Sequence, residues 1–160
     1  MSTRSNICIL NKEEKTIRKI YCHWDGYPEG VGQVLSDNYK DSNKVNELID
    51  LGDISILDKE VKPNNNLPHN FENPQENVTV AYTRDRGENW DWNKPQIFKI
   101  EEFAQFLRNH GDIEYIYLFL GEEKQWIYWD TYKIDRIANM LTDKELLQLA
   151  ENLKTRLKED

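Results

Sequence analysis

The segment IEYIYLFL, residues 113–120, constrains the fold more than any other part of the chain. Its apolar residues occupy even and odd positions alike, whereas the side chains of a strand alternate between the two faces of a sheet. A strand that is apolar on both faces is typical of the centre of a sheet that is covered on both sides. The sequence therefore predicts a layered domain with this segment as a central strand.

Other strands are expected on either side of this segment. Residues 6–10 and 17–25 form a hairpin across the polar turn NKEEKT, and residues 125–132 return after the turn GEEK to pair with the central strand. Residues 78–88 predict a further strand with a charged end. Residues 132–137 predict an extension of the preceding strand or a short strand of their own.

Apolar residues at helical spacing predict four helices between and after these strands. The last one is the clearest, because Thr142 and Glu145 have the spacing of a capping box. Its apolar stripe consists of Leu146, Leu149, Ala150, Leu153 and Leu157. The expected helices cover residues 30–39, 44–51, 100–111 and 142–160.

This order of elements predicts an α+β fold, with a mainly antiparallel sheet, helices packed on it and a C-terminal helix. A chain of 160 residues predicts a single domain over residues 1–160. Residues 59–77 are polar, irregular and rich in asparagine and proline. A loop of this length is either mobile or functional, and the sequence leaves both readings open.

Composition narrows the classes of partner. The formal net charge of −8 and the pI near 5.0 argue against direct nucleic-acid binding, which needs clustered lysine and arginine. No apolar run approaches the ~18–20 residues of a membrane span, and the first ten residues do not predict a secretory signal. Cys8 and Cys22 fall in expected strands and are expected to be reduced thiols in a cytoplasm, with a disulfide between them as the alternative.

The stretch YCHWDGYPEGVG, residues 21–32, is the first candidate site. A strand ends there, glycines follow and a helix begins, so backbone amides could bind an anion that approaches closely at the glycines. The alternative is an ordinary glycine-rich connection between a strand and a helix. The residues of the expected ligand site in this stretch are His23, Trp24, Asp25, Tyr27, Gly30 and Gly32.

No catalytic residue is assigned from the sequence. If the protein is an enzyme, His23 and Asp25 are the candidates, because both project from one side of a strand and could act as a base and its orienting group. Cys22 points to the opposite face, which argues against a Cys–His pair. The three histidines lack metal-ligand spacing, so no metal and no cofactor is expected.

The stretch TRDRGE is the second candidate site. In a strand, Arg84 and Arg86 would share one face, where two guanidinium groups suit a phosphate or carboxylate. Arg4, just before the first strand, would supply a third guanidinium if the strand ends converge. The alternative is a charged strand end in which Asp85 and Glu88 form internal salt bridges.

Tryptophans supply the third candidate surface. In QWIYWD, one face of the strand should be core and the other could stack on a ring, which makes Trp129 a candidate. Trp90 and Trp92 lie in a turn-rich insert and could anchor a partner. Ordinary packing in and around the core is the alternative for all three.

The stretches STRSNI, IYCHWDGYPEGVG, LIDLGDIS and TRDRGE together resemble a family of small proteins encoded by bacteriophages and prophages. The resemblance covers residues 2–56 and 78–88, and YCHWDGYP is its most specific part. It implies a setting, the cytoplasm of a host bacterium, and carries no mechanism. Phage accessory proteins of this size often block host systems.

Three functions remain open at this point. The first is sequestration of an anionic, nucleotide-like small molecule as counter-defence, with the glycine turn and the arginines meeting in one pocket. The second is inhibition of a host protein through an acidic surface that carries tryptophans. The third is hydrolysis or group transfer on a phosphorylated small molecule.

Overall fold

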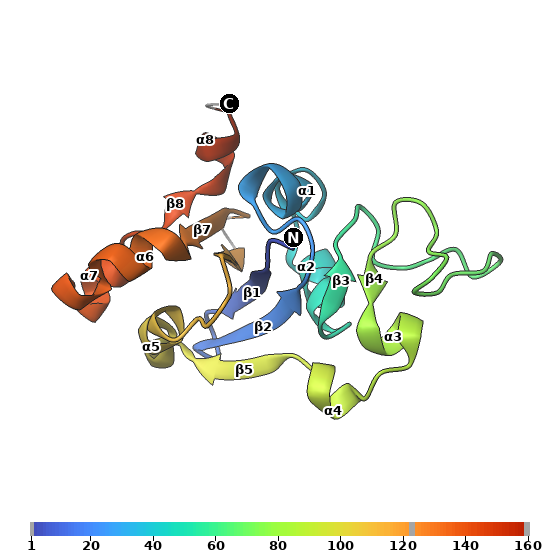
Figure 1. The fold of residues 1–160 in the computed structure, drawn as a ribbon, viewed down its shortest axis with the longest axis horizontal. Helices are drawn as coiled ribbons and strands as arrows, with labels where there is room; N and C mark the ends of the chain where they lie inside the picture. The colour runs from blue at the N-terminus through green and yellow to red at the C-terminus, as the bar shows by residue number, and fades with distance from the viewer. Residues whose placement is uncertain (1, 122–123, 159–160) are drawn as a thin grey trace.

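A computed structural model describes residues 2–121 and 124–158, and it shows one mixed sheet with helices on both faces (Figure 1). The strands are β1 (Ser5–Asn11), β2 (Thr16–Cys22), β3 (Ile54–Ile56), β4 (Val80–Ala81), β5 (Gln96–Lys99), β6 (Tyr115–Phe119), β7 (Trp126–Asp130) and β8 (Glu151–Asn152). The α-helices are α1 (Gln33–Asn38), α2 (Ser42–Ile49), α3 (Tyr82–Arg86), α4 (Trp90–Asn93), α5 (Phe103–Arg108), α6 (Thr131–Ile137), α7 (Asp143–Leu147) and α8 (Leu153–Lys158).

The α+β class is confirmed, but the sheet is mixed rather than mainly antiparallel. Its strand order is β4-β3-β2-β1-β6-β7-β8, and β5 pairs with the start of β2. The hairpins β1–β2 and β6–β7 are antiparallel, as expected, yet they meet along a parallel β1–β6 pairing. The sequence pattern could not show this, because alternation of apolar residues does not depend on the direction of the neighbouring strand.

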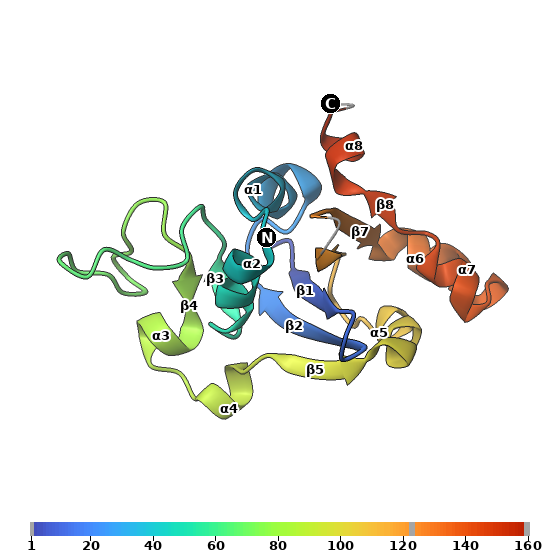
Figure 2. The same cartoon turned by 180° about the vertical axis from the view of Figure 1, so that it is seen from behind.

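The predicted central strand is confirmed. β6 lies between β1 and β7, and four of its five residues are buried. One core lies between the sheet and the helices α1, α2 and α8, and contains Ile7, Ile20 and Tyr117. The other lies between the sheet and α5, α6 and α7, and contains Cys8, Ile116 and Trp129. Figures 1 and 2 show these helices on the two sides of the sheet.

A C-terminal helix is confirmed as α8, but the prediction of one continuous helix from residue 142 onward is wrong. The Thr142–Glu145 capping box is present and begins α7. The chain then pairs with β7 as β8 before α8 begins. This break places Leu146 in one core and Leu153 in the other. The apolar stripe is therefore divided between the two faces of the sheet, which a straight helix cannot do.

Two other predicted extended segments are largely helical. Residues 78–88 form only the two-residue strand β4 before α3 begins, and Gly87 ends that helix with a φ of 71°. Residues 132–137 belong to α6, and the Asp130 side chain caps that helix by accepting from the amide of Tyr132 at 2.9 Å. In both places an Asp side chain bonds to a backbone amide and favours a turn over a strand.

The segment 59–77 has little regular structure, as expected. The side chain of Gln75 ties it together by donating to the carbonyl oxygens of Asn64 and Leu67 at 2.9 and 3.0 Å. Its mobility stays a prediction. None of the helices in residues 2–121 and 124–158 combines the length and the apolar character that crossing a bilayer requires.

Candidate anion-binding site

The glycine turn after β2 uses its backbone amides internally. The Gly26 amide donates to the Thr3 carbonyl at 2.9 Å, and the Val31 amide donates to the Asp25 carbonyl at 2.7 Å. The Gly30 amide donates to the carbonyl of Tyr27 at 2.9 Å. These three donors are therefore occupied by the chain itself and do not face a ligand.

The glycines of this turn are required by packing against the chain. A Cβ atom at Gly26 would lie 2.7 Å from the Thr3 carbonyl oxygen, and one at Gly30 would lie 2.4 Å from that of Asp25. At Gly32 the nearest neighbour would be Leu153 of α8, at 3.0 Å. The close approach that the sequence indicated is real, but the approaching group is protein.

Asp25 and Tyr27 belong to this turn and contact each other. Asp25 has a φ of 58°, a backbone conformation that asparagine and aspartate tolerate better than most residues. The Tyr27 hydroxyl donates to Asp25 Oδ1 at 3.4 Å. The His23 imidazole bonds to Tyr21, so the predicted base–orienter pair of His23 and Asp25 is not formed.

Arg84 is part of a partly buried polar network. Its guanidinium donates to the carbonyl oxygens of Val61 and Thr79 at 2.6 and 2.7 Å, and its Nε donates to Asp85 Oδ1 at 2.8 Å. Asp85 also accepts from the amide of Ala81 at 2.8 Å. Of the alternatives stated for this arginine, the structure favours the internal salt bridge.

Arg86 projects differently, because α3 replaces the expected strand and the two arginines no longer share a face. Its guanidinium lies 4.1 Å from the ring centre of Phe71 and 5.2 Å from that of Tyr82, and it pairs with Glu88. The hollow that Arg84 lines is built from α2, residues 61–69 and Asp85. Within the described part of the chain, no residue of the glycine turn lines that hollow.

Arg4 and His23 do come together, through a residue that the sequence analysis did not select. The Tyr21 hydroxyl lies 2.6 Å from His23 Nδ1 and is hydrogen-bonded by Arg4, which also pairs with Asp112 at 3.0 Å. Burial raises the pKa of Tyr21, and the Arg4 side chain lowers it in part. Trp24 extends the group, edge-on to His23 at 4.8 Å and 42% exposed.

Trp129 presents no ring face to a ligand. It is 2% exposed, packs edge-on against Phe103 at 5.1 Å and donates its indole hydrogen to the Leu146 carbonyl at 3.3 Å. Trp126 on the same strand is buried on the other side of the sheet. Both faces of β7 are therefore core, since helices cover both sides.

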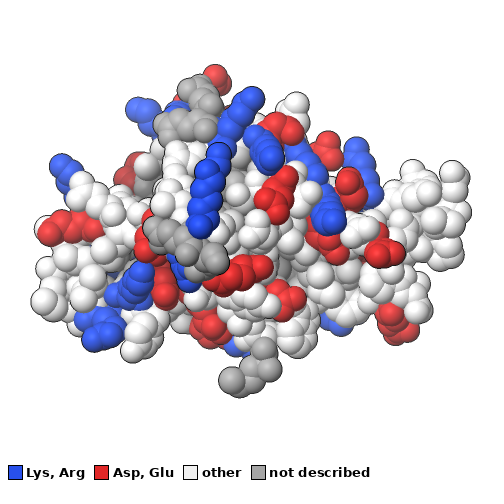
Figure 3. All heavy atoms as spheres, turned by 90° about the horizontal axis from the view of Figure 1, so that it is seen from above, with Lys and Arg blue, Asp and Glu red and all other residues white. Residues whose placement is uncertain are grey.

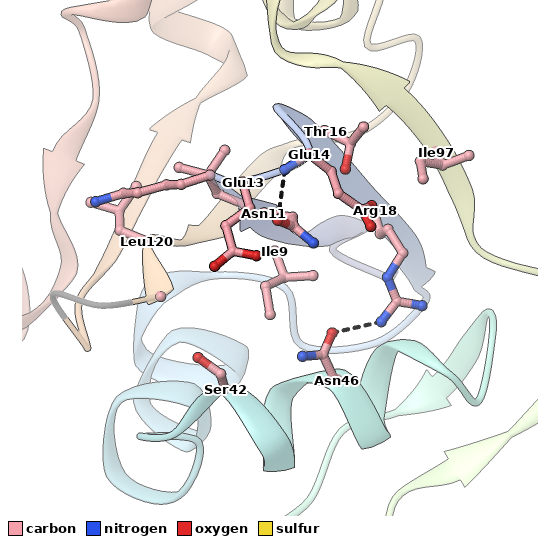
Figure 4. Close-up of a pocket in the computed structure, with 13 residues that line it drawn as sticks. Ile9, Asn11, Glu13, Glu14, Thr16, Arg18, Ser42, Asn46, Ile97 and Leu120 are labelled. Atoms are coloured by element: carbon pink, nitrogen blue, oxygen red, sulfur yellow. Dashed lines mark hydrogen bonds between the residues drawn. The ribbon is translucent and has the colours of Figure 1, made fainter.

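The hollow beside the β1–β2 turn offers an arginine that is already bonded (Figure 4). It measures about 270 Å³, and Arg18 is its arginine. The two terminal nitrogens of Arg18 donate to Asp50 and Asn46, each at 2.7 Å. Lys12 lines the hollow beside Glu13 and Glu14, so the charges of the described lining residues, including Arg18, balance.

A different groove collects positive charge. It measures about 660 Å³ and lies between α1, the start of β7 and α8, and its four basic residues are Lys40, Lys124, Lys154 and Lys158. We call it the lysine groove. Figure 3 looks down on this part of the molecule and shows basic side chains gathered across its middle.

The floor of the lysine groove is aromatic and rigidly bonded. Tyr39 and Trp126 line it, and the Trp126 indole donates to the Tyr39 carbonyl at 2.9 Å. Asp37 is the only acidic residue among the described residues of the lining, and it accepts from Gln33 at 2.9 Å. Among residues 2–121 and 124–158, no carboxylate forms an ion pair with any of the four lysines.

The sequence contained only part of the signal for this groove. Lys154 and Lys158 are four residues apart, which places them on one side of a helix. Lys40 follows α1 and Lys124 precedes β7, so only the packing of the two cores brings them to α8. Comparison with protein-family models, curated proteins and solved structures found no match to this chain.

Proposed function

We propose that this protein binds a small anionic, nucleotide-like molecule in the lysine groove, without chemical conversion. The observation that carries the proposal is charge segregation. The chain has 21 basic and 29 acidic residues, yet the charged residues in the described lining of this groove are four lysines and one aspartate. Like charges repel one another, so four lysines around one hollow are an electrostatic cost that an anionic ligand would remove.

The size and lining of the groove support a ligand of this class. Small-molecule sites usually occupy about 300–1,000 Å³, and the lysine groove lies in that range at about 660 Å³. Ammonium groups on flexible stems suit phosphates, which accept hydrogen bonds from several directions. Leu157 and the edge of Trp126 add apolar surface for the uncharged part of the ligand.

The resemblance to phage-encoded proteins supplies the biological setting of the proposal. A protein that retains a nucleotide-like signal would lower its free concentration in the host cytoplasm. Sequestration of this kind requires tight binding and no turnover. It therefore agrees with a groove that has charge and shape but no paired base and nucleophile among its described lining residues.

Titration calorimetry with a panel of nucleotides and inorganic triphosphate tests the proposal. The variant Lys154→Glu with Lys158→Glu should weaken binding at least tenfold, which is about 1.4 kcal/mol. The matched control is Lys94→Glu with Lys99→Glu, which makes the same change in net charge near β5. Absence of heat with every member of the panel would contradict the proposal. Equal weakening by the control would assign the effect to overall charge.

One observation favours the alternative of a protein inhibitor. Trp92 is 82% exposed on α4, and Trp90 and Ile97, which are near it along the chain, are 44% and 62% exposed. Exposed tryptophans often anchor protein interfaces. If a host protein binds at a one-to-one ratio, Trp92→Ser should release it, whereas Lys154→Glu with Lys158→Glu should not.

A further inference from the structure

Residues 64–75 form an irregular turn beyond β4, the strand at one edge of the sheet (Figure 1). We call these residues the histidine turn, because a buried histidine holds it closed from the inside. The side chain of His69 is 4% exposed, and its Nδ1 accepts from the backbone amide of Gln75 at 2.9 Å.

The hydrogen bond from Gln75 fixes the position of the hydrogen on the His69 ring. A backbone amide only donates, so Nδ1 is unprotonated and Nε2 carries the hydrogen of the neutral ring. Nε2 lies 3.2 Å from Oδ2 of Asp85 in α3. It makes no well-aligned hydrogen bond within the described chain, so the bond at Nδ1 is the one that ties the ring to the turn.

The closed histidine turn has no place for a second proton on His69. That proton would have to bind at Nδ1, since Nε2 already carries one. The N–H groups of Nδ1 and of Gln75 would then face each other as two donors without an acceptor, and a buried donor without an acceptor is destabilising. The closed turn therefore holds His69 as the neutral ring.

Asp85 would attract a charged His69, but its own charge is already compensated. Arg84 Nε donates to Asp85 Oδ1 at 2.8 Å, and the backbone amide of Ala81 donates to Oδ2 at 2.8 Å. Arg84 lines the same hollow as His69 and would repel a second cation there. The attraction of Asp85 therefore does not offset the conflict between the two donors.

The other charged groups in the described lining of this hollow are exposed. Lys62, from the same irregular segment, and Glu47, from α2, lie 3.9 Å apart, and their side chains are 78% and 47% exposed. Asp50, which follows α2, is 66% exposed and pairs with Arg18 at 2.7 Å. Water and salt screen exposed charges of this kind, so they act only weakly on His69.

We propose that the histidine turn is a pH switch, which opens when His69 takes up a proton. The open turn binds one proton more than the closed turn, and a lower pH favours the state that binds more protons. The turn should therefore open as the pH falls through the range in which histidine normally titrates, roughly pH 8 to 5. Opening would uncover Asp85 and the hollow of about 580 Å³ that His69 and Asp85 line. The lysine groove has no described lining residue in common with this hollow, so the switch does not depend on the proposed function.

Hydrogen exchange of the Gln75 amide, followed by NMR and corrected for the intrinsic effect of pH on exchange, tests the proposal. Between about pH 7.5 and about pH 5, the protection factor of this amide in the wild type should fall at least tenfold, because a solvated histidine changes from mostly neutral to mostly charged over this interval. His69→Asn should show no such fall. Its side-chain oxygen branches at the same position as Nδ1 and can accept from Gln75, but it does not titrate.

His23→Asn is the matched control, because it removes a histidine that does not line this hollow. It should retain the pH dependence of the wild type. The amides of β6 should stay protected at both pH values, and a parallel loss there would assign the change to global unfolding and overturn the proposal. An unchanged Gln75 protection factor in the wild type would also overturn it, as would an equal fall in His69→Asn or loss of the pH dependence in His23→Asn.

Discussion

Replacement of Arg84 by alanine tests whether this guanidinium serves the fold or a ligand. The variant removes the guanidinium beside Asp85, which is 9% exposed and keeps His69 Nε2 at 3.2 Å. It also removes the donors to the carbonyl oxygens of Val61 and Thr79. Breaking a buried ion pair by removal of one partner costs about 3–5 kcal/mol. The Arg84 side chain is 26% exposed, so we expect about 3 kcal/mol, the lower end of that range.

Urea unfolding followed by tryptophan fluorescence measures this loss. With a slope of roughly 2 kcal/mol per molar urea, the midpoint should fall by about 1.5 M. Arg86→Ala is the matched control, because its 49% exposed side chain pairs with Glu88 at the surface. It should cost about 1 kcal/mol or less. Equal losses for the two variants would refute the structural role assigned to Arg84.

The stability of the protein at acidic pH gives an independent check on the network of Arg84 and Asp85. Burial alone would raise the pKa of Asp85, but hydrogen bonds from Arg84 and from the Ala81 amide outweigh burial and hold it below its ordinary value of 3.8. A carboxyl whose pKa is lowered by folding stabilises the protein above its ordinary pKa, and this contribution disappears as the pH falls through the folded-state value. As the pH falls below 3.8, the free energy of unfolding should therefore decrease less for Arg84→Ala than for the wild type.

Further predictions concern the glycines and the thiols. Gly30→Ala should lower the free energy of unfolding by roughly 2 kcal/mol or more, because its Cβ would meet the Asp25 carbonyl. Gly111→Ala has open space and a φ of 65°, so it should cost only about 1 kcal/mol in the same urea assay. Burial raises the pKa of both Cys8 and Cys22 to about 12. A thiol reagent at neutral pH should therefore label them only as fast as the protein unfolds, and rapid labelling of folded protein would contradict this burial.

Alternation and capping predicted those parts of the fold that depend on neighbouring residues. The β1–β2 hairpin, the strand β6 and the Thr142 capping box were all confirmed, since each follows from side-chain spacing along a few residues. The sequence-based predictions failed where the structure of a segment depends on a partner that is distant along the chain. α8 turned to the opposite core because β7 offered an edge to β8, and the sequence around Glu151 contains no sign of that edge.

The candidate site shows the same division. The sequence showed which functional groups are present, namely guanidinium groups, a histidine and aromatic rings. It did not show whether these groups are free to bind a ligand. Arg84 and the turn amides were expected to be free, yet carbonyl oxygens from other segments accept their hydrogens. Tyr21 lies between Arg4, which precedes β1, and His23, which follows β2. It was assigned only a strand position because no local pattern marks a hydroxyl that contacts side chains outside its own strand.

The sequence by itself determined the α+β class, the central apolar strand and the acidic composition, because these depend on composition and on local periodicity. Only the tertiary structure decided which polar groups face solvent and where like charges meet. The lysine groove is assembled from segments that are distant along the chain. Hydrophobic packing in the two cores holds those segments side by side. The spacing of apolar residues directs this packing, and the charged residues have no part in that spacing.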